Sequence, residues 1–468
     1  MKAVRMTITN ANTSVILGWP TKLEISSSEK FKKLHPLMSK KRRYDISGAI
    51  KYHGDSHLIT FAPTGSGKGV SVIIPNLLHF TGSVIVIDPK GENFAITARY
   101  RRNKLKQKIF LLDPFHSIAD ELLEKYQVKR EKLNPLDLCL VSNTALENDV
   151  QMIANMLAGS ESLGDDPFWD ISAKKLISGL LAHEIDMSKK ENRSPKFSKV
   201  VDYLFGDDPI LNMATMLDEQ QPSKFVMSSI GGGFLSFPEL TRGSILAVAQ
   251  SYLSMLLSTE LLEWLDVSTI NLGDIQDGEK YTLYLVIPPS KLDSHSSLLA
   301  TWIGVLMLTI MERKQVPEQK TLFMLDECAN LGNLDVLKKA VTLLRGYGLQ
   351  VWMFFQDLAQ LQSLYTTDYL TMINNCGVLQ AFGIHRMSAA QPLTRLIGKY
   401  KASDLQGMDR TQQVLSKSPG KPRICRLMKY YEDPVFFGCY DDNPLRAATE
   451  ILNINPQEIV RIRKRRFN

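Results

Sequence analysis

The residues with the clearest capacity for chemistry form a short glycine-containing loop. The loop reads Ala62-Pro63-Thr64-Gly65-Ser66-Gly67-Lys68-Gly69 and precedes an apolar stretch from Val70 to Leu78. Small residues let backbone N–H groups close around phosphate oxygens at a helix N-terminus, and the Lys68 ammonium adds a point charge for the β- and γ-phosphates. This is the context of a P-loop. We therefore predict that ATP is bound by Thr64, Gly65, Ser66, Gly67, Lys68, Gly69 and Val70.

Two residues of the loop depart from the P-loop pattern GxxxxGK[ST]. Ala62 stands at the first glycine, a mild change because alanine is small. Gly69 stands where a serine or threonine hydroxyl would bind Mg²⁺. The loop therefore predicts a Mg²⁺ ion held by phosphates, waters and acidic residues from elsewhere in the chain.

An acidic pair supplies those residues. The apolar run Leu322 to Leu325 ends in Asp326 and Glu327, the arrangement known as Walker B. Asp326 is expected to hold the metal, usually through water, and Glu327 to share in the metal site and polarise the attacking water as general base. Such a pair alone is more often a solvated strand end. Its combination with the loop at Lys68 favours catalysis, because active groups collect at the carboxyl ends of parallel strands.

Three further side chains are weaker candidates. Gln356 ends the apolar run Val351 to Phe355 and could contact the γ-phosphate or its water; the alternative is a plain strand terminus. Arg345 and Arg386 are candidates for arginine fingers that reach a neighbouring subunit, although most arginines are simply surface residues.

Seven apolar runs must position these groups. Each is continuous rather than alternating, which is typical of parallel strands covered on both faces. They are Leu58 to Ala62, Val84 to Ile87, Ile109 to Leu112, Thr282 to Ile287, Leu322 to Leu325, Val351 to Phe355 and Val378 to Phe382. Helical spacing separates them, which predicts a doubly wound, mostly parallel α/β fold of the RecA-like P-loop NTPase type.

The sheet pattern stops after Asp113 and resumes only at Thr282, which is too long a gap for one crossover. Helical stripes within it predict an inserted all-α domain. The expected division is an N-terminal extension over 1–45, a motor domain over 46–188 and 251–445, an all-α insertion over 189–250 and a basic tail over 446–468.

Composition agrees with a large globular protein. The 468 residues are 44% hydrophobic and 22% charged, with a formal net charge of +7. Two basic runs, Lys40 to Arg43 and Arg461 to Arg466, suit nucleic acid or anionic lipid but are more often solvated surface. The longest apolar stretch, Leu298 to Met311, is shorter than the roughly twenty residues of a membrane span. We expect a cytoplasmic protein, with a peripheral place at the inner face of the membrane.

These motifs belong to an ordered series that resembles the type IV coupling proteins, the ATPases that deliver DNA and its relaxase to a conjugative secretion channel. The matching segments, in chain order, are Ala62 to Gly69, Ile74 to Leu78, Asp88 to Asn93, Asn134 to Leu136, Phe168-Trp169, Asp326-Glu327, Leu331-Gly332, Arg345 to Gly348, Gln356-Asp357, Asn375 to Gly377 and Tyr430-Tyr431. Glycine after the P-loop lysine is common in that family.

The resemblance implies a homohexameric ring, single-stranded DNA and a relaxase as cargo, partners in the type IV secretion channel, and an all-α domain that meets DNA and substrate proteins. Such proteins usually begin with a membrane-spanning domain, whereas about forty-five residues precede the motor here. A separate membrane-anchored protein is the expected partner. Two other functions stay open, a double-strand DNA translocase of the segregation or repair type and a substrate-receptor scaffold with little ATPase activity.

Overall fold

The computed structural model describes residues 14–21, 46–159, 166–220, 222–343 and 345–445. The basic runs Lys40 to Arg43 and Arg461 to Arg466, and the whole tail predicted over 446–468, lie outside these residues. Within the described part, no single helix is long and apolar enough to cross a membrane. Two consecutive helical segments, Glu239–Leu256 and Thr259–Leu265, together reach the length and apolar composition of a membrane span, but they are bent by 90° relative to each other.

A nine-stranded sheet organises the molecule, in the order β11-β10-β9-β3-β8-β7-β4-β6-β5. Seven neighbouring strands are parallel, and they are the seven predicted from the apolar runs. Their bounds are β3 His57–Phe61, β4 Ser83–Ile87, β5 Lys108–Leu112, β6 Tyr281–Leu285, β7 Thr321–Leu325, β8 Leu349–Phe355 and β9 Cys376–Ala381. Because β8 lies between β3 and β7, the P-loop strand and the Walker B strand are separated by the strand that directly precedes Gln356.

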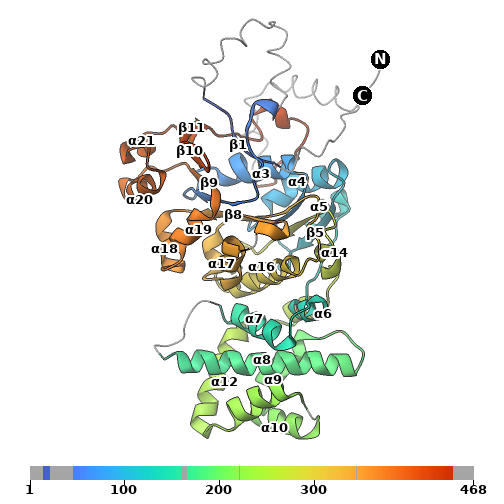
Figure 1. The fold of residues 1–468 in the computed structure, drawn as a ribbon. Coiled ribbons are helices and arrows are strands. Elements are labelled where there is room, and N and C mark those ends of the chain that lie inside the picture. The colour runs from blue at the N-terminus through green and yellow to red at the C-terminus, as the bar shows by residue number, and fades with distance from the viewer. Residues whose placement is uncertain (1–13, 22–45, 160–165, 221, 344, 446–468) are drawn as a thin grey trace, which may run out of the picture.

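Helices cover both faces of this sheet, which explains why its parallel strands are mostly apolar on both sides. In β7, Leu322 and Met324 join the core cluster that contains Phe94, whereas Phe323 and Leu325 join the other one. One face carries α3 Ile74–His79, α4 Glu92–Asn103 and α5 Asp120–Tyr126, and the opposite face carries α16 Ser296–Met311, α17 Asp335–Leu343, α18 Leu358–Leu364 and α19 Tyr369–Asn374 (Figure 1). The stretch Leu298 to Met311 is therefore a buried core helix, as expected.

The segment between β5 and β6 folds into helices, and no β-strand occurs among its described residues. After α5, they are the 3-10 helix η5 Pro135–Asp137, α6 Leu138–Val141, α7 Leu146–Ala158, α8 Pro167–Lys190, α9 Phe197–Phe205, α10 Pro209–Glu219, α11 Lys224–Val226, the π-helix η6 Met227–Leu235, α12 Glu239–Leu253, the 3-10 helix η7 Ser254–Leu256, α13 Thr259–Leu265 and α14 Leu272–Gln276. Helices α7 to α10 and α12 form a layer below the sheet (Figure 1). This is the inserted all-α domain. Its predicted limits, 189 and 250, fall inside α8 and α12, so the division stays a prediction.

The edge of the sheet beyond β9 carries elements that were not predicted from the sequence. A hairpin of β10 Gln412–Lys417 and β11 Arg423–Arg426 pairs antiparallel with β9, next to α20 Met387–Ile397 and α21 Ala402–Gln406. A separate two-stranded sheet joins β1 Val15–Gly18 to β2 Ile50–Tyr52. It lies against the hairpin, because the backbone N–H of Trp19 donates to the carbonyl of Arg426 over 2.8 Å. The short helix α15 Pro289–Leu292 follows β6.

Candidate nucleotide-binding site

The P-loop connects β3 to a π-helical turn, Gly69–Ile73. Two positions have left-handed backbone, Gly65 with φ 79° and Gly67 with φ 93°, which only glycine adopts easily. Ser66 closes the turn between them, because its N–H and its hydroxyl both donate to the carbonyl of Pro63, over 3.2 and 2.6 Å. The loop therefore curls tightly ahead of Lys68, as phosphate binding by backbone N–H groups requires.

Lys68 is buried and forms ion pairs with the acidic pair. Its Nζ lies 2.6 Å from Glu327 Oε1 and 3.8 Å from Asp326 Oδ1, and the side chain is 7% exposed. Gln356 Nε2 donates to Glu327 Oε2 over 3.3 Å. The structure thus brings Lys68, Asp326, Glu327 and Gln356 together from the ends of three neighbouring strands.

The backbone at the end of β7 determines where Glu327 points. Glu327 has left-handed backbone, with φ 52° and ψ 51°, a conformation that costs a non-glycine residue roughly 1–2 kcal/mol. Strain of this kind concentrates at functional sites. The turn places consecutive side chains, Asp326 and Glu327, on the same side of the sheet edge, where both face Lys68.

The site shifts the acidity of two carboxyl groups. Burial raises the pKa of Asp326 to about 6, against the opposing effect of the Lys68 charge. Burial also raises the pKa of Asp88 to about 7, although the backbone N–H groups of Asn93 and Phe94 donate to its carboxylate over 3.2 and 2.8 Å. A carboxyl that titrates near pH 6 is mostly ionised at pH 7, so Asp326 is available as a metal ligand at that pH.

Lys68, Asp88, Asp326 and Glu327 line a pocket of about 320 Å³, whereas Gln356 lies behind Glu327 and does not line it. All the residues predicted to bind ATP line it except Ser66, whose hydroxyl donates a hydrogen bond to the carbonyl of Pro63. The pocket also contains residues without a predicted site role: Ile74, Asp88, Pro89, Lys90, Glu92, Asn93, Pro289, Leu292 and Asn443. Asp88 to Asn93 carry a local signal, because Asp88 follows the apolar run Val84 to Ile87 and the segment is one of those that match the family. Asn443 gave no signal, and it reaches the pocket by donating from Nδ2 to Glu92 Oε1 over 2.8 Å.

The arginine-finger candidates are not part of this pocket. Arg386 is exposed at the start of α20 and does not line the pocket within this chain. The side chain of Arg345 lies outside what the structure describes.

The acidic pair fits a Mg²⁺ ion in the presence of phosphates. No group of three or more His, Cys, Asp or Glu side chains is placed to hold a metal among the residues that the structure describes. Mg²⁺ typically keeps several waters and is bound through one or two carboxylates plus substrate phosphates. Asp326 beside the phosphate-binding loop meets that requirement, with Glu327 as its neighbour.

Gly69 leaves room for the hydroxyl that the P-loop lacks, since a Cβ built there meets no atom within 4 Å. We expect Gly69→Ser to tighten Mg²⁺-dependent ATP binding by a factor of roughly 2 to 12, the equivalent of about 0.5–1.5 kcal/mol for one added polar contact. Titration of a fluorescent ATP analogue with and without Mg²⁺ measures the effect. Gly69→Ala is the control, because it adds the same Cβ without the oxygen. Equal affinities for the two variants would contradict the expectation.

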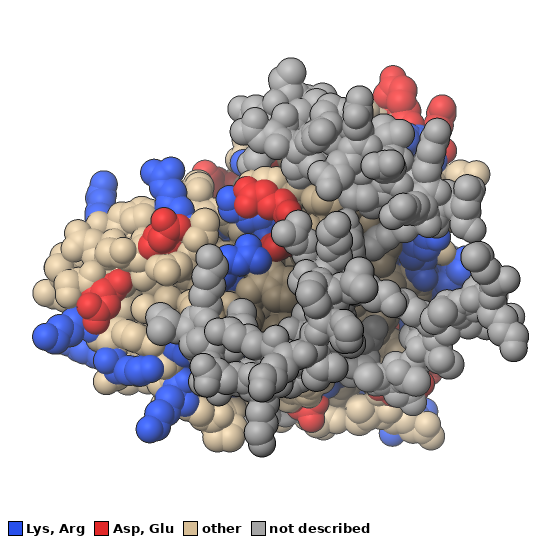
Figure 2. Space-filling view, turned by 90° about the horizontal axis from the view of Figure 1, so that it is seen from above, with Lys and Arg blue, Asp and Glu red and all other residues tan. Residues whose placement is uncertain are grey.

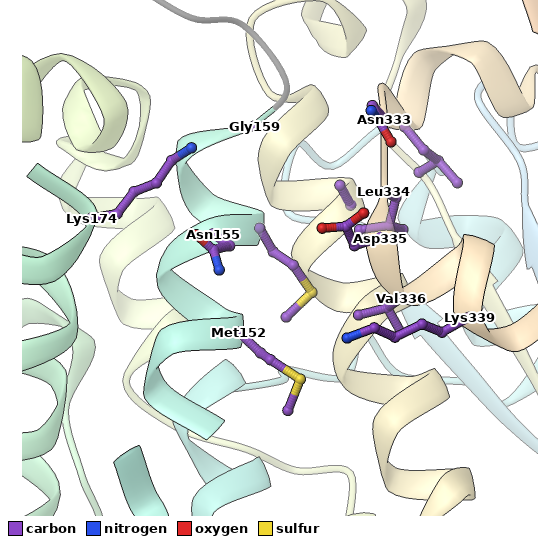
Figure 3. A pocket seen from close by; sticks show the side chains of 12 residues that line it. Met152, Asn155, Gly159, Lys174, Asn333, Leu334, Asp335, Val336 and Lys339 are labelled. Carbon is purple, nitrogen blue, oxygen red and sulfur yellow. The ribbon is translucent and has the colours of Figure 1, made fainter. Parts of the chain in front are cut away.

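A second pocket, of about 310 Å³, lies where the all-α domain meets the motor. Figure 3 shows Asn155 and Lys174 on the side of α7 and α8, facing Asn333 to Lys339 on the other side. The second wall consists of the loop that follows Glu327 through the 3-10 helix Cys328–Leu331, and of the first residues of α17. The Walker B strand end and the all-α domain are therefore connected through one short segment.

Comparison with known proteins identifies the family. The model of the family described as type IV secretory system conjugative DNA transfer matches residues 21–419. The chain belongs to this family. The resemblance expected from the motifs is confirmed.

Two relatives illustrate the distance within the conjugative DNA-transfer family. The conjugal transfer protein TraG of Escherichia coli is 25% identical over 368 residues, which cover 75% of this chain and 56% of TraG. The type IV secretion system-coupling protein VirD4 of Bartonella henselae is 24% identical over 354 residues, which cover 74% of this chain and 53% of VirD4. The chain thus spans about half the length of the curated relatives that it matches.

Solved structures of a conjugative coupling protein share the fold. TrwBdeltaN70 in complex with sulphate superposes with a TM-score of 0.65 at 14% identity, covering 89% of this chain and 94% of the other. TrwB in complex with ADP and Mg²⁺ gives 0.64 at 13% identity, covering 89% and 93%. The predicted fold class, a RecA-like α/β domain with an all-α insertion, is confirmed.

Proposed function

We propose that this protein is an ATP-hydrolysing coupling protein that recruits a relaxase–DNA substrate and drives DNA translocation to a type IV secretion channel. The observation that carries the proposal is that Lys68 of the P-loop contacts Glu327, which in turn contacts Gln356. These contacts occur in a chain that belongs to the conjugative DNA-transfer family. ATP and Mg²⁺ are the proposed ligands, in line with the ADP and Mg²⁺ of TrwB.

ATP binding has a direct consequence for the acidic pair. Lys68 Nζ donates to Glu327 Oε1. A P-loop lysine serves the β- and γ-phosphates, so phosphate oxygens would replace this carboxylate as its partner. The exchange releases Glu327 from the ammonium at the moment when a phosphoryl group arrives. A carboxylate without its cationic partner is the stronger proton acceptor, which suits a general base.

The remaining groups have distinct proposed tasks. Gln356 Nε2 contacts Glu327 Oε2, so the amide can orient the freed carboxylate and the attacking water together. Asp326 would hold Mg²⁺, usually through water, and the bound ion would neutralise charge that develops on the phosphates. Backbone N–H groups of the P-loop would position the phosphate chain without being consumed in the reaction.

The assembly that we propose is a homohexamer, active when its subunits meet. Its partners would be single-stranded DNA and relaxase, and components of the type IV secretion channel. The proposed location is the cytoplasm, at the inner face of the cell membrane. Family membership and the likeness to conjugative coupling proteins support this part of the proposal.

The test is the ATPase rate against protein concentration, without DNA, with single-stranded DNA and with duplex DNA. We expect a rate per subunit that rises with concentration, because the sites are completed between subunits, and stronger stimulation by single strands. Greater stimulation by duplex would favour the double-strand translocase instead. Negligible turnover under all conditions, with a relaxase still bound, would favour the receptor scaffold.

A further inference from the structure

Positive charge is concentrated at one edge of the sheet. Residues 386–429 contain ten Lys and Arg and only two Asp and Glu, a net charge of +8. The chain as a whole has 56 basic and 49 acidic residues, so everything outside this segment holds 46 and 47 and is close to neutral. We call the surface formed by residues 386–429 the basic edge. It comprises α20, α21 and the hairpin of β10 and β11.

The all-α domain has the opposite charge. Residues 146–276, from the start of α7 to the end of α14, contain nine Lys and Arg and nineteen Asp and Glu, a net charge of −10. In Figure 1 this domain lies at the far end of the molecule from α20, α21 and the hairpin. The molecule is therefore electrically asymmetric along its length.

Several cations of the basic edge are available to a partner. The exposed side chains of Arg395, Lys401, Arg410 and Lys421 form no salt bridge with a carboxylate of the described residues. By contrast, Arg426 pairs with Asp433 over 2.8 Å. Figure 2 shows Lys and Arg side chains projecting along the left side of the molecule, the side on which Figure 1 places these elements.

The fold holds these cations on one structural unit. Lys399 Nζ at the end of α20 donates to the carbonyl of Pro422 over 2.8 Å, and the hydroxyl of Tyr400 lies 3.4 Å from the same oxygen. These contacts fasten the helices to the turn of the β10–β11 hairpin. Charges from elements separated in sequence are thus kept close together, as binding to a polymer with regularly spaced charges requires.

We propose that the basic edge binds the phosphate backbone of nucleic acid and that the all-α domain does not. The proposal rests on the proposed function, which makes DNA the cargo, and adds which surface carries it. Contact with phosphates releases counterions and supplies affinity without sequence preference. An all-α domain with ten more acidic than basic residues would repel the same backbone at long range. The charge distribution thus assigns DNA binding to the basic edge. It does not favour the all-α domain, which the resemblance implies as the domain that meets DNA.

A lipid surface is the less suitable occupant. Stable docking on a membrane usually combines basic residues with apolar side chains that enter the bilayer boundary. Residues 386–429 expose a single large hydrophobic side chain, that of Met387, which is 40% exposed. The basic edge is therefore a surface for a polyanion in water.

The test compares two triple variants of the full chain. Arg395→Gln, Lys401→Gln and Lys421→Gln together remove three unpaired charges from the basic edge. Lys175→Gln, Lys196→Gln and Lys224→Gln together remove the same charge from exposed positions of the all-α domain. Binding of a fluorescent oligothymidylate is measured by anisotropy over a series of salt concentrations. We expect the slope of log K against log salt to fall by about 2 for the first variant, at about 0.7 per lost phosphate contact, and to be unchanged for the second.

Each result has a definite meaning. Equal slopes in the two variants would overturn the proposal, because the effect would then be one of net charge alone. Unchanged DNA binding by the basic-edge variant, with loss of its binding to vesicles of phosphatidylglycerol, would overturn it in favour of a lipid surface. If the unmodified chain showed no salt-dependent affinity for DNA, the proposed function itself would fail.

Discussion

Replacing Glu327 by Gln should lower the ATP hydrolysis rate by about 10²–10⁴-fold, the contribution usual for a general base. The amide keeps the size of the side chain and its contact with Gln356 but cannot accept the proton of the attacking water. ATP affinity should be preserved or improved, since Lys68 loses the carboxylate that it contacts over 2.6 Å. A steady-state phosphate-release assay, together with titration of an ATP analogue, separates the two effects.

Glu312→Gln provides the matched control. It makes the same chemical change at the end of α16, at a residue that does not line the nucleotide pocket. The hydrolysis rate of this variant should equal that of the unmodified protein. Normal turnover by the Glu327→Gln variant would remove Glu327 from the role of general base.

The Lys68→Ala substitution should weaken ATP binding by roughly 10- to 150-fold, because a hydrogen bond to a charged group contributes about 1.5–3 kcal/mol. It should also affect the metal site. The Lys68 charge holds down the pKa of Asp326, which burial has raised to about 6. Without that charge the pKa should rise further, so a larger fraction of Asp326 would be protonated near neutral pH. Mg²⁺-dependent binding should then weaken more at pH 6 than at pH 8.

Lys320→Ala is the comparison for this variant. Lys320 also forms an ion pair, with Asp55 Oδ1 over 2.5 Å, but it precedes β7 at the opposite end of that strand from Asp326. The ATP affinity of the Lys320→Ala variant should equal that of the unmodified protein. An equal loss in both variants would indicate general destabilisation, and a pH-independent loss in Lys68→Ala would contradict the linkage to Asp326.

Much of the scaffold could be predicted because its signals are local. Parallel strands with both faces covered are mostly apolar, and all seven such runs are strands of the sheet. The missed hairpin has a different character. β10 reads QQVLSK and is placed by polar contacts, with Thr60 donating to Gln380 over 2.7 Å and Gln380 donating in turn to Gln413. A buried chain of one hydroxyl and two amides across three strands leaves no hydrophobic period in the sequence.

The sequence by itself determined the P-loop at Lys68, the acidic pair and the positions of the parallel strands along the chain, because each depends on neighbouring residues and on the alternation of strand and helix. Only the tertiary structure decided that Glu327 contacts Lys68, a residue 259 positions away, and that Asn443 closes the pocket through Glu92, 351 positions away. Such contacts depend on strand order and on one left-handed turn. The separation of charge between the basic edge and the all-α domain likewise became visible only once the fold placed the two segments at different ends.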